Sequence, residues 1–214
     1  MSAPRVCPDR NVLVSLSAER GPRQGPRSPA SSARAAAGAA DGDDSSAALV
    51  ALAVEGDRAA FGRLFRMFAP MVHGILLARV PSREARDLMQ DVFVSALERL
   101  GSLRQADAFG GWLAMIARNR ATDFHRREEH RRTAPLEDED VGVCDPDRAQ
   151  VEELLAHIRE LPAAYSETLV LRLVEGMTGP EISARVGLTP DSVRVNLHRG
   201  MALLRKRLSA EDGR

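Results

Sequence analysis

Apolar residues recur every three or four positions through most of residues 46–127, the period of an α-helix with one buried face. Asp57 is placed to cap a first helix, and Pro70 predicts a kink or a break inside it. Pro81 opens a second helix, and Asp107 is placed to cap a third. Because three such stripes need one another to be buried, the pattern predicts a helical bundle.

A second helical block covers residues 149–208. Thr178 and Glu181 have the spacing of a capping box, which predicts the start of a helix. Gly187 is placed to end that helix, and Pro190 falls in the first turn of the next one. Two helices joined by a tight glycine turn are typical of a helix-turn-helix.

The remaining segments lack this periodicity. Residues 1–45 are rich in Ala, Gly, Pro, Ser and Arg and predict a disordered extension. Residues 128–148 contain a run of acids and predict a flexible acidic linker, and residues 209–214 form a short tail. The expected fold class is therefore all-α, with two small helical domains on either side of the linker.

The amino-acid composition excludes several classes of protein. The 214 residues include 30 basic and 30 acidic side chains, so a globally basic nucleic-acid binder is excluded while local basic patches are not. Aromatic residues are only 4%, which argues against an all-β fold. No apolar run is long enough to span a membrane, and the apolar stretch near the N-terminus is too short for a signal peptide. We therefore expect a soluble, cytoplasmic protein without membrane insertion.

Metal and catalytic sites find little support in the sequence. Cys7 and Cys144 lie far apart, which favours a reducing compartment and indicates neither a zinc site nor a disulfide scaffold. His125, Glu129 and His130 do not have the spacing of a zinc-protease motif, so a metal-dependent hydrolase is disfavoured. The nucleotide-binding and nucleophile-elbow motifs are also absent. We expect no cofactor and no catalytic residue.

Three charged helix faces suggest binding instead. In the second helix of the expected helix-turn-helix, side chains that suit base edges and phosphates are Ser192, Arg194, Asn196, His198 and Arg199. Arginines outnumber acids in residues 118–132, which favours contact with a nucleic-acid backbone. The helix before it is acidic through Asp87 and Asp91, with Gln90 on the same polar side, which suggests a docking face for a basic protein.

Three segments resemble one family when taken in order. They are Asp87–Phe93 (DLMQDVF), Phe109–Asn119 (FGGWLAMIARN) and Gly176–Arg199. Together they resemble bacterial RNA polymerase sigma factors of the extracytoplasmic-function (ECF) group. The resemblance implies a promoter-specificity subunit with region 2 at residues 46–127 and region 4 at residues 149–208.

The resemblance also implies partners and site residues. Region 2 would bind the β′ clamp helices of core RNA polymerase through Asp87, Gln90 and Asp91, and region 4 would meet the β flap. The surface for the melted minus-ten element would consist of Phe109, Arg118, Asn119, Asp123, Arg126 and Arg127. The minus-thirty-five duplex would be read through Arg194, Val195, His198 and Arg199, while Ser192 and Asn196 are DNA-binding candidates from the chemistry of the same helix face. An anti-sigma factor is a further expected partner.

Two points stay open on the sequence alone. Val195 and His198 depart from the residues that many members carry, so the promoter sequence is not defined. The alternative is an autonomous helix-turn-helix regulator whose N-terminal bundle binds a ligand or dimerises.

Overall fold

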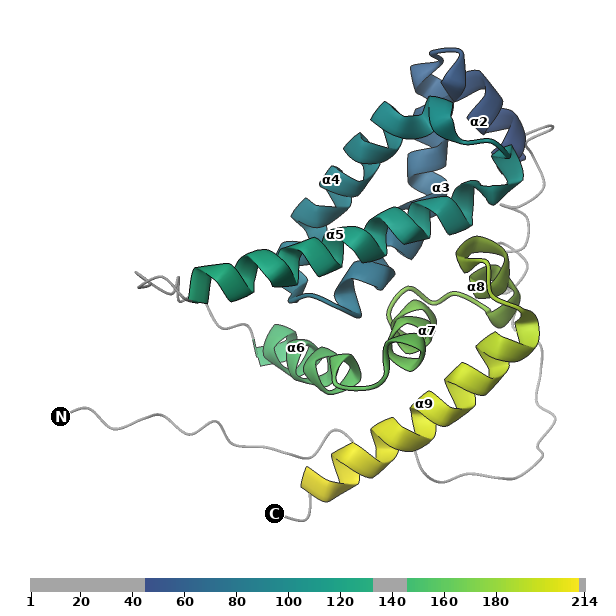
Figure 1. Ribbon diagram of the computed structural model, residues 1–214. Helices are drawn as coiled ribbons and strands as arrows, with labels where there is room; N and C mark the ends of the chain where they lie inside the picture. The colour runs from purple at the N-terminus through teal and green to yellow at the C-terminus, as the bar shows by residue number, and fades with distance from the viewer. Residues whose placement is uncertain (1–44, 133–145, 212–214) are drawn as a thin grey trace. The chain divides into compact units, whose positions relative to one another are not determined.

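A computed structural model describes residues 45–132 and 146–211, and within these ranges every regular element is helical (Figure 1). This confirms the all-α fold class. The N-terminal group comprises α2 (Ser46–Val54), α3 (Arg58–Leu77), α4 (Ser82–Arg99), the short 3₁₀ turns η4 (Leu100–Ser102) and η5 (Ala106–Ala108), and α5 (Phe109–Arg132). The C-terminal group comprises α6 (Pro146–Arg159), α7 (Ala163–Leu173), α8 (Gly179–Val186) and α9 (Pro190–Glu211).

Side-chain caps fix where several helices begin. The Asp57 carboxylate accepts hydrogen bonds from the backbone N–H groups of Ala59 at 2.7 Å and Ala60 at 3.1 Å, which confirms the predicted cap of α3. The Ser45 hydroxyl accepts one from Ala48 at 3.2 Å and begins α2, a helix that the sequence pattern had not separated from its neighbour. These caps satisfy backbone donors that lack partners at a helix start.

Two predictions made for the N-terminal group differ from the structure. Pro70 lies inside α3, which continues to Leu77, so the predicted break is wrong, while a kink at this residue stays a prediction. Buried side chains on both sides of the proline, such as Phe68 and Val72, hold the helix against its neighbours and offset the missing backbone donor. Asp107 lies within η5 rather than at the N-cap of α5.

The predicted linker is shorter on both sides than its acidic composition suggested. Helix α5 extends to Arg132 and α6 already begins at Pro146, so helix covers part of residues 128–148. Residues 133–145, with Cys144, lie outside the described residues, as do residues 1–44 and 212–214. The predicted extension, its Cys7 and the end of the predicted tail therefore remain predictions.

Helix α3 is the centre of the N-terminal group and contacts α2, α4 and α5. Its Leu64, Val72 and Ile75 are fully buried, and Phe68 meets Phe109 of α5 edge-to-face with ring centroids 5.1 Å apart. Helix α7 has the same role in the C-terminal group, where it packs against α6, α8 and α9. All residues from 166 to 171 are buried, so the middle of α7 is enclosed on every side, while both of its ends are exposed.

The two groups pack directly against each other, α7 and α8 against α3 and α8 also against α5. Two glycines allow the close approach. A Cβ built on Gly74 would lie 2.8 Å from a methyl carbon of Leu171, and one built on Gly110 would lie 2.6 Å from the carbonyl oxygen of Arg185. Both distances are shorter than normal van der Waals contact, so these helices meet backbone to side chain and backbone to backbone.

Candidate nucleic-acid and protein interfaces

Helices α8 and α9 form the predicted helix-turn-helix. The backbone N–H of Thr178 donates to the Glu181 carboxylate at 2.7 Å, and the Thr178 hydroxyl accepts from the Glu181 backbone at 3.4 Å, which confirms the capping box. Gly187 then turns the chain with φ +76°, a left-handed conformation that favours glycine. The Thr189 hydroxyl accepts from the Ser192 backbone at 3.2 Å and starts α9.

The capping box makes the start of α8 sensitive to acid. The hydrogen bonds from the Thr178 backbone and hydroxyl hold the pKa of Glu181 below its usual value. The cap therefore stabilises the fold above the unfolded-state pKa, and this stability is lost as the pH falls through the lowered folded-state pKa. Between about pH 6 and about pH 3 we expect the wild-type chain to lose more melting temperature than Glu181→Gln, measured by circular dichroism. Parallel losses would contradict this role of the carboxylate.

Helix α9 has an inner and an outer face. Val193 and Leu204 point inward and are buried in the core. On the outer face Ser192, Arg194, Val195, His198 and Arg199 are exposed, and Asn196 is half-buried. The Arg194 side chain is 80% exposed and forms an ion pair of 3.3 Å with Asp191 one turn earlier. All six predicted DNA-contacting residues of this helix thus lie outside the core, and five of them are exposed.

The structure divides the predicted region 2 residues into two sets. The exposed or half-exposed set follows one side of α5 and consists of Asn119, Asp123, Arg126 and Arg127. Within it, Arg126 donates to Asp123 at 3.0 Å. The other two residues, Phe109 and Arg118, point into the molecule. Phe109 has no exposed surface and lies between Phe68 and Trp112, with ring centroids 5.1 and 5.9 Å away.

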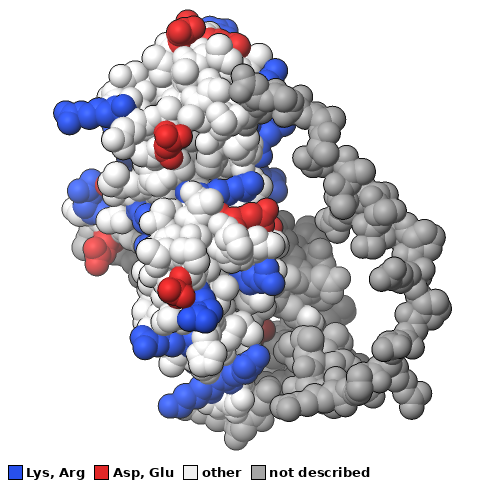
Figure 2. Space-filling view, turned by 90° about the vertical axis from the view of Figure 1, so that its right-hand side faces the viewer, with Lys and Arg blue, Asp and Glu red and all other residues white. Residues whose placement is uncertain are grey.

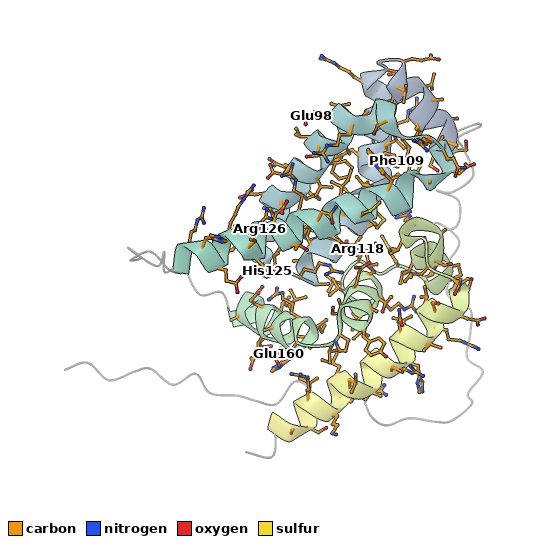
Figure 3. All side chains as sticks on the ribbon, viewed as in Figure 1. Glu98, Phe109, Arg118, His125, Arg126 and Glu160 are labelled. Atoms are coloured by element: carbon orange, nitrogen blue, oxygen red, sulfur yellow. The ribbon has the colours of Figure 1, made fainter. Side chains whose placement is uncertain are left out.

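Arg118 is held by a carboxylate of the C-terminal group. Its Nε donates to Glu167 at 3.0 Å and its Nη2 donates to the other oxygen of the same carboxylate at 2.6 Å. Arg79, two residues after the end of α3, donates to Glu167 at 2.9 Å. Glu167 is only 4% exposed, and its hydrogen bonds raise the pKa of the Arg118 guanidinium. Figure 3 shows Arg118 and His125 on the side of α5 that faces α6 and α7.

Further polar contacts link the same two groups. His73 of α3 lies 2.7 Å from the Glu175 carboxylate, and Arg159 of α6 donates to the carbonyl of Leu77 at 3.0 Å. The sequence analysis did not find this set of contacts. The sequence offered one signal, Glu167 itself, which is the only charged residue between Ala163 and Leu171.

The predicted docking face of α4 is intact and larger than expected. Asp87, Gln90 and Asp91 are all exposed. Val94 and Leu97 continue the same side of the helix and are 57% and 52% exposed. The sequence analysis missed these two residues, although apolar side chains at helical spacing on a polar face were the signal. An acidic half followed by an apolar half is suited to binding a protein surface that is both basic and apolar.

On the face of the molecule that Figure 2 shows, Lys and Arg side chains are interspersed with Asp and Glu. Within residues 45–132 and 146–211, three or more potential metal ligands do not come together anywhere. The helices of the described ranges are also too short or too polar to cross a membrane.

A helix-turn-helix with a basic outer face, beside a bundle with an acidic docking face, defines a DNA-binding protein that also docks on another protein. The family model for sigma-70 region 2 matches residues 64–131, and that for sigma-70 region 4 matches residues 151–204. The chain belongs to the ECF RNA polymerase sigma factors. It is therefore a promoter-specificity subunit that binds core RNA polymerase, recognises promoter elements and helps to melt DNA.

Individual relatives agree with this assignment. The chain is 32% identical to the RNA polymerase sigma factor CarQ of Myxococcus xanthus, over 72% of this chain and 92% of that protein. It is 35% identical to the ECF sigma factor SigM of Mycobacterium tuberculosis, over 77% of this chain and 85% of that protein. Among solved structures, CnrH in complex with the cytosolic domain of CnrY matches with a TM-score of 0.56 and 26% identity, covering 78% of this chain and 99% of that chain.

Proposed function

We propose that the chain binds promoter DNA and core RNA polymerase through three separate surfaces. The outer face of α9 reads the upstream promoter element as duplex through Ser192, Arg194, Val195, Asn196, His198 and Arg199. The exposed side of α5 binds the melted downstream element. The α4 face of Asp87, Gln90 and Asp91, extended by Val94 and Leu97, docks on the β′ clamp helices of the polymerase. The C-terminal group also meets the β flap.

The observation that carries this proposal is the presence of an intact α4 docking face and an intact α9 reading face on one chain. An autonomous regulator needs only the second of these. Residues 46–132 act as the first functional domain and residues 146–208 as the second, and the chain contributes binding energy without a catalytic site or cofactor of its own. Such a protein acts in the cytoplasm, where the polymerase is.

Within α5, the two sets of residues have different roles. Asn119, Asp123, Arg126 and Arg127 are accessible in the packed arrangement and can meet single-stranded DNA directly. Arg118 joins that surface only when the two groups separate, because Glu167 of the C-terminal group holds it. Phe109 stays buried between Phe68 and Trp112 of its own group and supports the surface from inside.

We further propose that a protein of the anti-sigma class holds the chain inactive. CnrH, one of the similar solved structures, is in complex with the cytosolic domain of CnrY. The exposed apolar residues Val94 and Leu97 of α4 offer a surface that such a partner would cover.

Run-off transcription tests the function directly. The full chain is added to core RNA polymerase with a library of genomic fragments, and initiation from a defined set of promoters is the expected result. Core polymerase alone provides the baseline. Tight sequence-specific duplex binding without polymerase, together with no gain in initiation, would instead identify an autonomous regulator.

Charge reversal on α4 tests the docking face. We expect the double variant Asp87→Arg, Asp91→Arg to weaken binding to core polymerase by about tenfold, because two attractions at the interface become repulsions worth about 1–2 kcal/mol together. Competition against a labelled wild-type chain measures the affinity. Glu55→Arg, an exposed change just after α2 and outside the proposed surfaces, is the control and should bind normally. Equal affinities for all three chains would remove Asp87 and Asp91 from the interface.

A further inference from the structure

Val195 is an apolar residue in the middle of a polar face. It is the sixth residue of α9, is 39% exposed, and belongs to the outer face with Arg194, His198 and Arg199. The core does not use it, because Val193 and Leu204 supply the buried contacts of this helix. A β-branched side chain is also a poorer helix former than the arginines around it, so local stability gives no reason for valine at this position.

The side chains around Val195 form a hollow. It has a volume of about 260 Å³, is lined by Arg194, Val195, His198 and Arg199, and its exposed lining is apolar. This spacing places the four residues together on adjacent turns of α9. Since both arginines turn their aliphatic stems toward the hollow, their charged ends are left to contact groups around its rim.

Only one base presents an apolar group in the major groove of DNA, namely thymine with its C5-methyl. We propose that Val195, with the apolar stems around it, binds the C5-methyl group of a thymine in the upstream promoter duplex and thereby selects that base. The inference rests on the proposed function, in which the outer face of α9 enters the major groove. It extends that function by naming the chemical group that this hollow recognises.

The neighbouring arginines make this contact selective for one base of the promoter, because they fix the position of α9 on the duplex. Arginine ends at the rim can bind guanine or the phosphates on either side, which fixes the register of α9 on the duplex. With the register fixed, the base opposite Val195 is always the same one. A cytosine there would bring a polar amino group and no methyl group to an apolar lining, so it would lose contact and leave a donor unpaired.

The test removes the methyl group from DNA and nothing else. Holoenzyme assembled from core polymerase and the full chain first selects sequences from a library randomised upstream of the start site. Each thymine of the enriched element is then replaced in turn by deoxyuridine, which pairs identically but lacks the C5-methyl. At one position we expect about fourfold weaker binding, the factor for losing one methyl-sized apolar contact.

Two variants assign the effect to a side chain. With Val195→Ala the thymine and deoxyuridine duplexes should bind equally at that position. Leu203→Ala removes another exposed apolar side chain of α9, two turns further on and outside the hollow, and should keep the fourfold difference.

Each other outcome counts against the inference. It is overturned if the enriched element contains no thymine, if no thymine is sensitive to loss of its methyl group, or if the sensitivity persists in Val195→Ala. In those cases the enrichment itself still supports the proposed function. A holoenzyme that enriches no upstream sequence contradicts both.

Discussion

Glu167→Gln should lower the free energy of unfolding by about 2–3 kcal/mol. The substitution keeps the shape of the side chain but leaves Arg118 and Arg79 without their shared carboxylate charge. Removing one partner of a buried ion pair costs about 3–5 kcal/mol. We place the loss below that range because the two arginine side chains are 33% and 23% exposed, and water compensates part of the missing charge.

Urea unfolding measures the loss, and small-angle X-ray scattering of the folded variant measures whether the two groups separate. Glu160→Gln is the matched control, since Glu160 also pairs with an arginine, Arg207, but at an exposed site. The control should change stability by less than about 0.5 kcal/mol. If both variants unfold at the same urea concentration and scatter like the wild type, the ion pairs of Glu167 with Arg79 and Arg118 do not hold the N-terminal and C-terminal groups together.

The second large effect is expected at two adjacent glycines of α5. Gly110→Ala should destabilise the protein by about 1–3 kcal/mol, because its Cβ would lie 2.6 Å from the Arg185 carbonyl oxygen and 3.1 Å from the Phe68 ring. A backbone oxygen cannot move aside as a flexible side chain does. Helix α8 would therefore have to shift away from α5.

Gly111→Ala makes the same chemical change one residue later, where nothing lies within 4 Å of the new Cβ. Because alanine is the better helix former, this variant should gain about 0.5–1 kcal/mol. Thermal unfolding of the pair therefore gives shifts of opposite sign. Shifts of the same sign would show that α5 and α8 do not meet as closely as the backbone positions indicate.

The sequence could predict the elements whose cause is local. The Asp57 cap, the Thr178–Glu181 capping box and the Gly187 turn each depend on residues within a few positions of one another. Helical periodicity likewise depends on neighbours three and four residues apart. These signals were sufficient for the fold class and for locating the helix-turn-helix.

Features that depend on distant residues could not be predicted in the same way. Pro70 is tolerated because packing against other helices stabilises α3, which the local sequence does not reveal. Arg118 and Glu167 are 49 positions apart, so neither residue marks the other. From spacing alone Arg118 and Asn119 both belong to a basic helix, but the structure turns the first inward and the second outward.

The ion pair between Glu167 and Arg118 also affects how tightly the protein can bind a nucleic acid. One guanidinium cannot hold this carboxylate and a nucleic acid in the same geometry, so the two are competitors. A ligand that needs Arg118 free binds only the molecules in which the ion pair with Glu167 is broken. Each 1.4 kcal/mol or so of stability of that ion pair therefore weakens the apparent affinity for the ligand about tenfold. Reciprocity requires that a ligand which captures Arg118 loosens α7 from α5 by the same factor. On the proposed function, this ion pair therefore adds to the binding energy that the promoter must supply, together with the other contacts between the two groups.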